Sequence, residues 1–496
     1  MNAVSSSTDL ARKTLKGILW SALTFAAGKG ITFLSTVVLA RLLTPDDFGL
    51  MALGLLAIAY IDTFGELGVG NVVIYRRDHL EENSSVAFTL GLLVNFSLMA
   101  IAFFVAPLVS AFFKEPRLVE ILRVLSLTLF ISGLGTIHQA RLNRELRFKK
   151  TFLPETGKTL AKAIVSIGLA WLGWGVWSLV WGQIAANLTA TALYWFSFRW
   201  LPRLTLKWEI VRQQLSYSSH LLLVEIMAII RSNLDYVIIG RRFDTTSLGY
   251  YTMAYRVPEL LIIFVCSAVS KALFPAFSSV QDHLETLQRG YLNTLRYMAL
   301  YSLPVGVGMA LVTAEFVTVA YGSQWHPSIP IMQVLSLYAV MYSLAYHAGD
   351  IYKATGRPDI LSKTSMLDVA IGAPLLWLGA NYGIFYVAVA HLLANTLMTT
   401  IKLTLVVRLV HLRFTDIFRA LQPALTASAM MLAGLLALHP ATMGLYPLLR
   451  LVLLASSGAL LYAGALWLFN REVALHGMDL LRHTFFKRLE PEGTRQ

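Results

Sequence analysis

The chain has 496 residues, of which 56% are hydrophobic and only 14% are charged, and its mean hydropathy is +0.62. A soluble domain carries about 25% charged residues, so this chain has too little polar surface to face water on all sides. The formal net charge of +13 follows membrane topology, because the basic residues gather in the loops of one side,. Nucleic-acid binding is therefore not expected.

Apolar stretches of about 20 residues, long enough to cross a hydrocarbon core of roughly 30 Å, recur along the chain. Each is expected to be a helix, because a backbone in lipid must pair its amides within its own segment or in a closed barrel, and these stretches are too long and too apolar for barrel strands. The predicted fold class is all-α and polytopic, with about fourteen transmembrane helices. The predicted spans are 15–40, 47–70, 84–106, 118–140, 155–173, 176–197, 214–240, 248–274, 292–320, 329–352, 361–379, 384–407, 420–438 and 447–469.

The basic residues predict the orientation of these helices. With the N-terminus in the cytoplasm, most Lys and Arg residues fall in inside segments, such as the cluster at 141–150, whereas few fall in outside loops,. An even number of helices then places both termini in the cytoplasm. The single cysteine, Cys266, lies within a span and forms no intramolecular disulfide,.

Two stretches 200 residues apart echo each other, VVLARLLTPDDFGLMAL at 37–53 and VIIGRRFDTTSLGYYTM at 237–253. Each is predicted to be a helical hairpin on the outer face, with Pro45 breaking the helix and Asp46 or Asp47 capping the next one. Two more pairs recur in the same chain order at similar offsets. They are VLSL at 124–127 and 334–337, and GVWSLVWGQIAAN at 175–187 with GIFYVAVAHLLAN at 383–395.

These echoes predict a duplicated unit of six helices. We expect an N-lobe at 1–205 and a C-lobe at 206–412, related as parallel repeats, with a substrate path where the two halves meet. Residues 413–470 add two further helices. Residues 471–496 form a cytoplasmic basic tail, which is expected either to lie in the headgroup region as an amphipathic helix or to fray.

Six segments carry a likeness to a known family. They are LARLLTPDDFGLMALG (39–54), ELGVGNVVIYRR (66–77), GWGVWSLVWGQ (173–183), SNLDYVIIG (232–240), LFPAFSSVQD (273–282) and YGSQWHPSIPIMQVLSL (321–337). By their order and spacing the chain resembles the polysaccharide exporters, or Wzx-type oligosaccharide flippases, of the multidrug/oligosaccharidyl-lipid/polysaccharide (MOP) exporter superfamily, and within them the colanic-acid-exporter branch.

The resemblance implies a V-shaped pair of lobes around a central cationic cavity, which alternates between inward-open and outward-open states. It implies transport of an anionic, undecaprenyl-diphosphate-linked oligosaccharide from the cytoplasmic to the periplasmic leaflet, for exopolysaccharide, capsule or O-antigen (lipopolysaccharide) biosynthesis. The expected location is the bacterial inner membrane. The expected partners are the lipid-linked oligosaccharide, membrane lipids and a polymerase or export machinery, and no enzymatic activity is expected.

Ionisable residues inside spans are functional candidates, because a charge at a helix centre costs at least about 2.5–3.5 kcal/mol. Lys29 lies mid-span between two glycines, and the alternative to a substrate contact is an ion pair with Asp62 or Glu66 of the next helix. The predicted cavity cations are Lys29, Lys158, Lys162, Arg231, Arg256 and Lys271. The positions of Lys158 and Lys162 would also be explained as ordinary basic residues flanking a span. Arg231 and Arg256 would instead be neutralised by Asp235 and Glu259 on the same helices. Four other cations near span ends are expected to extend toward the interface, namely Arg123, Arg296, Lys402 and Arg450,.

No nucleotide-binding motif is present, because Gly157-Lys158-Thr159 lacks the required glycine at Phe152,. No metal motif is found either, so a proton or sodium gradient is expected in place of a cofactor. The carboxylates considered for coupling are Asp62, Glu225, Asp235, Asp350 and Asp368. By analogy with superfamily members that bind a cation in the second lobe, Asp368 with Asn395 or Thr396 is a candidate ligand set, joined by Asp235.

Three tyrosines, Tyr338, Tyr342 and Tyr346, form an i, i+4, i+8 stripe that either stacks on sugars or packs between helices. Three functional alternatives stay open: a drug or small-metabolite exporter of the same superfamily, a peptidoglycan-precursor flippase, and a membrane enzyme such as a glycosyltransferase. The enzyme is disfavoured because the longest outside loop is only about a dozen residues and carries no acid, base or metal constellation.

Overall fold

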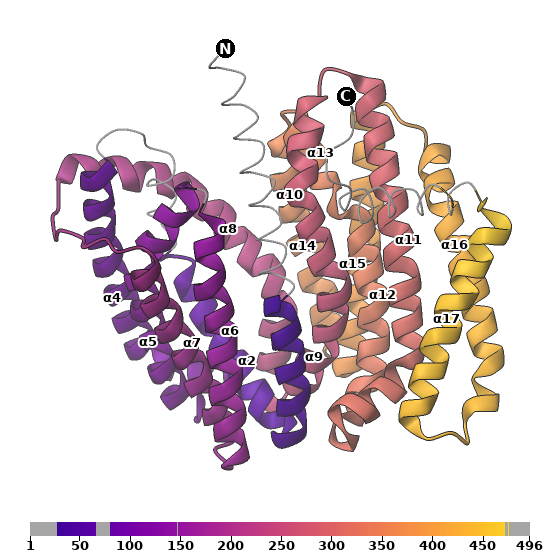
Figure 1. Ribbon diagram of the computed structural model, residues 1–496, viewed down its shortest axis with the longest axis horizontal. Coiled ribbons are helices and arrows are strands. Elements are labelled where there is room, and N and C mark those ends of the chain that lie inside the picture. Colours follow the sequence, from indigo (N-terminus) through magenta and orange to yellow (C-terminus); the bar gives the residue numbers. More distant parts are fainter. Residues whose placement is uncertain (1–26, 66–79, 146, 472–474, 476–496) are drawn as a thin grey trace, which may run out of the picture. The chain divides into compact units, whose positions relative to one another are not determined.

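A computed structural model describes residues 27–65, 80–145, 147–471 and 475. Over these residues each predicted span coincides with a helical stretch, and the all-α prediction is confirmed (Figure 1). Eight of the described helical segments are long and apolar enough to cross a membrane by length and composition. Glu66 and most of the predicted tail, residues 472–474 and 476–496, lie outside the described residues.

The described chain divides into two compact units, the first with residues up to Thr252 together with Leu376–Val387, and the second with Met253–Leu375 and the residues from Ala388 onward. The predicted lobe boundary at 205/206 rests on the sequence repeat, and it stays a prediction.

In the first unit α4 to α7 lie side by side, and α2 packs on α5 and α8 (Figure 1). After the helical residues 27–42, its helices are α2 (Pro45–Asp62), α4 (Leu80–Phe113), α5 (Leu118–Arg144), α6 (Phe148–Trp171), α7 (Val176–Ser197) and α8 (Trp208–Arg242). The unit also takes the first half of α9 (Thr245–Pro258).

In the second unit α11 is the central helix and packs on α12, α16 and α17. The elements after α9 are the π-helix η1 (Glu259–Ile263), α10 (Phe264–Ser279), α11 (Leu284–Phe316), the π-helix η2 (Val317–Tyr321), η3 (Ser323–Ser328), α12 (Ile329–Tyr346), α13 (Ala348–Ala354), α14 (Pro358–Gly379), α15 (Ile384–Leu409), α16 (Phe414–Leu438), η4 (Pro440–Thr442) and α17 (Pro447–Phe469). The two C-terminal helices therefore attach to this unit through α11.

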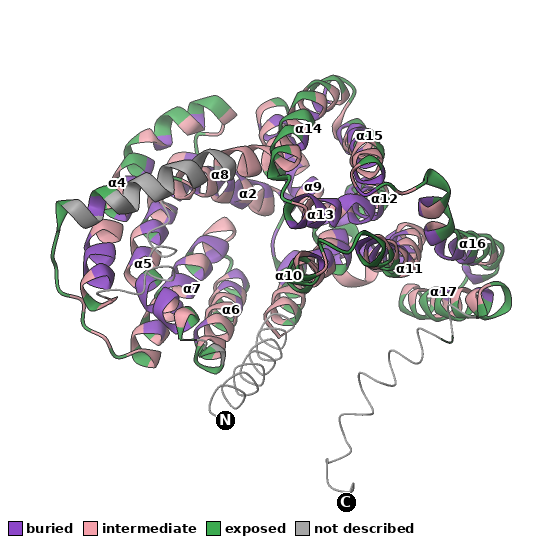
Figure 2. Ribbon diagram, turned by 90° about the horizontal axis from the view of Figure 1, so that it is seen from above, coloured by how far each residue is buried: buried purple, intermediate pink, exposed green. Residues whose placement is uncertain are grey.

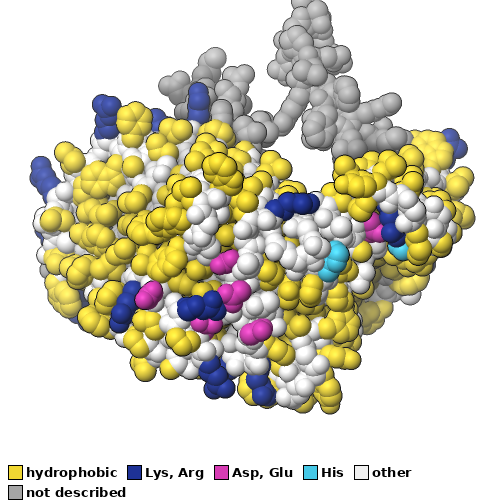
Figure 3. All heavy atoms as spheres, turned by 90° about the horizontal axis from the view of Figure 1, so that it is seen from below, with side chains coloured by type: hydrophobic (Ala, Val, Ile, Leu, Met, Phe, Trp, Pro, Cys, Tyr) yellow, Lys and Arg dark blue, Asp and Glu magenta, His cyan; other side chains and the backbone are white. Residues whose placement is uncertain are grey.

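Many large apolar side chains are exposed, and Figure 2 shows exposed residues along the outward faces of the helices. On α17 only Leu454, Gly458 and Ala465 are buried, while Leu460 and Leu468 are each 74% exposed. Hydrophobic side chains also cover most of the face drawn in Figure 3, where charged side chains form small groups. A multi-pass membrane protein explains this pattern, because lipid solvates such faces.

The turn before α2 corrects one expectation. Thr44 is the N-cap, with extended backbone, and its hydroxyl accepts from the amide of Asp47, whose carboxylate accepts from the Thr44 amide at 2.9 Å. Asp46 and Asp47 lie inside the helix because α2 already begins at Pro45, so neither can be the cap. At the equivalent position 200 residues later, Asp244 accepts from the amide of Ser247 at 2.8 Å.

Candidate functional site

The predicted lysines of the first unit lie near one another. A methyl group built on Gly28 would come within 3.7 Å of the Thr159 hydroxyl, so the helix that carries Lys29 passes close to α6. On α6, Lys158 lies close enough to Asp62 to act on it electrostatically. One turn further, the Lys162 ammonium donates to the Gln183 amide oxygen at 2.6 Å.

We name Lys29, Lys158, Lys162 and Asp62 the lysine group. The three lysines are half-buried, which leaves part of each side chain accessible. Gly30 adds room, because a methyl group built on it would meet nothing within 4 Å. The group brings several cations and one carboxylate together, and point charges of this kind attract diphosphate or carboxylate groups.

The other cavity cations are more scattered. Arg231 of α8 is half-buried, and the nearby Asp235 accepts a hydrogen bond from Tyr251 at 2.8 Å. In the second unit Arg256 and Lys271 are both exposed, and Arg256 lies close enough to Tyr321 to act on it electrostatically.

The tyrosine stripe is a continuous run of ring contacts within the second unit. The ring centroids of Tyr338 and Tyr342 are 5.9 Å apart, and those of Tyr342 and Tyr346 are 5.6 Å apart. Tyr338 also contacts His391 of α15 at 4.1 Å, and it is buried, with 6% of its surface exposed. Tyr342 and Tyr346 are half-buried, so these two rings retain surface on which a pyranose can stack.

The carboxylates considered for ion coupling have distinct surroundings. Asp368 of α14 accepts from the Lys402 ammonium of α15 at 2.7 Å. Asn395 donates to the backbone oxygen of Tyr338 at 3.4 Å, and the Thr396 hydroxyl donates within its own helix. Asp350 is buried beside His347. No group of three or more His, Cys, Asp or Glu side chains suited to a metal ion occurs within the described residues.

Two polar clusters were missed from the sequence, and the first is buried. The Glu315 carboxylate of α11 is 2.9 Å from the Arg450 guanidinium of α17, which in turn contacts His439 at 2.7 Å. Arg450 and Lys402 were expected to extend toward the interface, but each instead meets a carboxylate. The pair of Glu315 and Arg450 could have been suspected from the sequence, because each is the single charged residue in a long apolar run.

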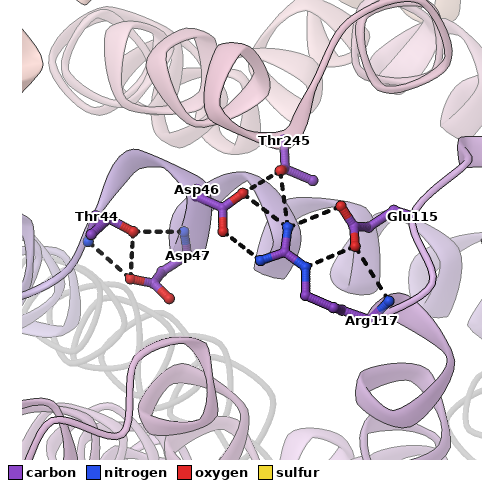
Figure 4. Close-up of polar contacts among 6 residues, drawn as sticks. All are labelled: Thr44, Asp46, Asp47, Glu115, Arg117 and Thr245. Atoms are coloured by element: carbon purple, nitrogen blue, oxygen red, sulfur yellow. Dashed lines mark hydrogen bonds and ion pairs between the residues drawn. The ribbon is translucent and has the colours of Figure 1, made fainter.

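A second polar group lies where the turns at 43–44, 114–117 and 243–244 meet, which we call the hairpin end (Figure 4). The Arg117 guanidinium bonds Asp46 at 2.7 and 3.1 Å and Glu115 at 2.8 Å, and the Thr245 hydroxyl also donates to Asp46. Hydrogen bonds from Arg117 hold the pKa values of Asp46 and Glu115 below their ordinary range,. The group joins the start of α2 to the start of α9.

Two glycines at the hairpin end let α2 and α9 touch through their backbones. A methyl group on Gly49 would lie 1.7 Å from the Thr245 carbonyl oxygen, and one on Gly249 would lie 1.8 Å from the Pro45 carbonyl oxygen. The contact is reciprocal, since residues 45 and 49 meet residues 245 and 249. The sequence echo at an offset of 200 residues thus coincides with a symmetric helix crossing in the first unit.

The helical arrangement matches solved transporters over most of the chain. A structure of the lipid II flippase MurJ in an inward-closed conformation aligns with a TM-score of 0.72 at 15% identity, covering 92% of this chain and 99% of that one. An inward-facing MATE-family multidrug transporter aligns with a TM-score of 0.63 at 14% identity, covering 77% and 94%. The chain therefore has the fold of the MOP-superfamily transporters.

Sequence comparison identifies the family within that fold. The chain belongs to the polysaccharide biosynthesis protein family, whose profile matches residues 38–330. It is 25% identical to the lipopolysaccharide biosynthesis protein WzxC of Escherichia coli K12, across 79% of this chain and 81% of the relative. It is 22% identical to the teichuronic acid biosynthesis protein TuaB of Bacillus subtilis 168, across 71% and 73%. It is 25% identical to the succinoglycan biosynthesis transport protein ExoT of Rhizobium meliloti 1021, across 66% of each chain.

Proposed function

We propose that this protein flips an undecaprenyl-diphosphate-linked, anionic oligosaccharide from the cytoplasmic to the periplasmic leaflet of the bacterial inner membrane, for surface or secreted polysaccharide biosynthesis. The observation that carries the proposal is a likeness over most of the chain to named polysaccharide transport and biosynthesis proteins, combined with the fold of a lipid flippase. The protein works as a transporter and has no enzymatic activity of its own.

In this proposal the lysine group receives the anionic part of the substrate. A diphosphate carries charge that cannot cross lipid unpaired, because an isolated ion costs tens of kcal/mol by Born solvation in a medium of low dielectric. Lys29, Lys158 and Lys162 offer ammonium donors on adjoining helices of the first unit. The exposed Arg256 and Lys271 add positive charge in the second unit. Tyr342 and Tyr346 offer faces for the sugar rings.

The hairpin end then serves as a periplasmic gate. The positive-inside distribution of basic residues supports this proposal, because it predicts that this end faces the periplasm and both chain termini face the cytoplasm. The backbone contact of Gly49 with Gly249 and the hydrogen bond from the Thr245 hydroxyl to Asp46 hold the gate closed. Alternating access requires that these contacts separate when the substrate leaves, so each contact contributes to the equilibrium between the closed and open states.

Transport against a gradient requires a source of free energy, which we propose is a proton or sodium gradient. Candidate coupling residues are Asp62, Asp235, Asp350, Asp368 and Asn395. The ion pair between Asp368 and Lys402 offers one simple device, since protonation of that carboxylate releases the lysine. A polymerase or export machinery is the proposed partner downstream, because flipped repeat units must be joined.

The drug-exporter alternative is less well supported. The MATE-family structure aligns with 77% of this chain, whereas the lipid II flippase aligns with 92%. A peptidoglycan-precursor flippase shares the fold, but its sequence identity of 15% is below the 25% found for WzxC. The structural alignment therefore favours a large lipid-linked substrate, and the sequence identities favour a polysaccharide pathway.

Deletion of the gene, followed by analysis of inner-membrane lipids, tests the proposal. An undecaprenyl-linked oligosaccharide is expected to accumulate in the cytoplasmic leaflet, and the cognate polymer is expected to disappear from the surface or medium. If no such lipid accumulates and the sensitivity to drugs changes, the drug-exporter alternative is correct. Accumulation of the peptidoglycan precursor, with cell lysis, would instead identify a peptidoglycan-precursor flippase.

A further inference from the structure

A buried acid and base lie together where α12 ends and α13 begins. His347 and Asp350 are each only 3% exposed, and the His347 Nδ1 atom is 3.0 Å from a carboxylate oxygen of Asp350. The Ser270 hydroxyl of α10 is 2.7 Å from both oxygens of the same carboxylate. Burying ionisable groups is costly, so an acid and a base that are buried together are functional candidates.

The other ring nitrogen of His347 is the informative atom. Nε2 is buried and has no hydrogen-bond partner among the described residues. If Nδ1 carries the hydrogen donated to Asp350, Nε2 presents a bare lone pair; if Nε2 carries a hydrogen, that donor is unsatisfied. Buried polar atoms are nearly always paired, so an unpaired one on a titratable ring requires an explanation.

A purely local capping role does not explain the arrangement. The His347 side chain makes no hydrogen bond to the backbone of α13. The Asp350 carboxylate instead bonds Ser270 of a different helix, 80 residues earlier in the chain. The pair is therefore hydrogen-bonded to α10, which follows directly on the π-helix at Glu259–Ile263. π-Helical turns occur frequently at functional sites.

Side chains of α10 and α12 contact the pair. From α10 it meets Ser270, and from α12 it meets Tyr346, whose ring lies 5.3 Å from the His347 ring. Lys271, next to Ser270, is exposed, as is Lys353 on α13.

Tyr352 of α13 does not face the pair, because its hydroxyl donates to the backbone oxygen of Lys402 on α15. Through Tyr346 the pair continues into the ring contacts of Tyr342 and Tyr338, which end at His391. Hydroxyl and imidazole groups thus extend from the buried pair along α12.

We propose that His347 and Asp350 together bind the coupling proton of the transport cycle, with Ser270 as the positioning residue. In the empty state neutral His347 donates from Nδ1 to the Asp350 carboxylate, and the pair carries a net charge of −1. A hydronium ion gives one proton to the Nε2 lone pair, so an N–H bond forms, an O–H bond of the hydronium breaks and water leaves; the loaded pair of imidazolium and carboxylate is neutral. No other bond forms or breaks. The inference rests on the proposed function, and it specifies the proton and its site.

The donor set favours a proton over sodium. Hard cations select oxygen ligands, whereas here the carboxylate is already bonded by an imidazole nitrogen and one hydroxyl. A neutral loaded pair also remains in a low-dielectric environment at far lower cost in free energy than a charged pair does. The empty pair, with its net charge, is stable only where water or a cation reaches it, and this difference links the proton to the conformational change.

The test uses the full chain in proteoliposomes with the lipid-linked oligosaccharide extracted from the deletion strain. The membrane potential is clamped at zero, sodium is omitted, and the leaflet distribution of the oligosaccharide is measured with a membrane-impermeant reagent at several pH gradients. One proton per cycle predicts an approximately tenfold change in distribution per pH unit, which corresponds to about 1.36 kcal/mol. Asp350→Asn and His347→Asn are expected to abolish this dependence while still equilibrating the lipid between leaflets.

His411→Asn is the matched control, because His411 is exposed and its backbone φ of 52° is one that asparagine tolerates,. It is expected to keep the tenfold dependence.

If Asp350→Asn and His347→Asn keep the dependence as well, or if only sodium drives the wild type, the inference is wrong while the flippase function stands. If neither variant flips lipid, Ser270→Ala decides: it is expected to flip with a shifted pH profile, and an unshifted profile overturns the inference. A wild type that flips nothing contradicts the proposed function itself.

Discussion

The sharpest prediction concerns the glycine contact at the hairpin end. Gly249→Ala places a methyl carbon 1.8 Å from the Pro45 carbonyl oxygen, whereas ordinary contacts begin near 3.4 Å. The backbones of α2 and α9 must therefore separate by roughly 1.6 Å, the difference between those two distances. Neither side can yield by rotating a side chain, because both contacting surfaces are backbone.

The expected magnitude follows from the cost of overpacking. Forcing extra carbon into a packed contact costs about 1–3 kcal/mol. That strain acts only in the closed state, so the ratio of open to closed molecules rises by about 5- to 150-fold. Gly49→Ala is expected to act similarly, because its methyl group meets the Thr245 carbonyl oxygen at 1.7 Å.

Accessibility of a cysteine measures this shift. Thr245 is 7% exposed at the hairpin end, so Thr245→Cys in a Cys266→Ser background is expected to react slowly with a membrane-impermeant maleimide. Adding Gly249→Ala is expected to raise the labelling rate by about 5- to 150-fold, as the open state becomes more populated, and to reduce export. Gly168→Ala is the control, since it is also helical and its methyl group meets nothing within 4 Å. Equal labelling rates in the two alanine variants would refute the closed-gate interpretation.

Three further predictions concern charges. Lys29→Ala is expected to cripple polymer export while the protein still inserts, measured by polymer output and membrane abundance; normal output would contradict the role of the lysine group. Glu315→Gln leaves Arg450 without its carboxylate and is expected to cost about 3–5 kcal/mol, seen as a lower thermal-unfolding midpoint that Arg450→Met partly restores; an unchanged midpoint would count against the buried pair. Because the Asp46 pKa lies below its ordinary 3.8, that carboxylate stabilises the fold above this value and loses the effect as the pH falls through its lowered pKa. The unfolding midpoint of Arg117→Met is therefore expected to fall less steeply with acid than that of the wild type, and parallel profiles would contradict this reasoning.

The membrane fold could be predicted from the sequence because its causes are local. An apolar run of about 20 residues must be helical in lipid whatever its neighbours are. Pro45 and the polar residues beside it likewise marked a hairpin, although the cap proved to be Thr44. The echo at an offset of 200 residues also marked the place where Gly49 and Gly249 meet.

The pairing of charges within the helices could not be predicted in the same way. Sequence reasoning finds partners three or four residues away, since they share a helix face. Asp368 instead pairs with Lys402, 34 residues later, and Glu315 pairs with Arg450 of a distant helix. Which helices adjoin is set by side-chain packing over the whole chain, and spacing along one helix carries no information about it.

The sequence by itself thus determined the solvent of this protein, its helices and its family. Only the tertiary structure decided which polar groups meet, as at His347, Asp350 and Ser270, where the i, i+3 spacing of the first two was visible but the hydroxyl comes from another helix. The physical reason is that hydropathy is a property of each segment alone. Electrostatic and hydrogen-bonding contacts act over a few ångströms, so they depend on the three-dimensional packing of segments that are distant in the chain.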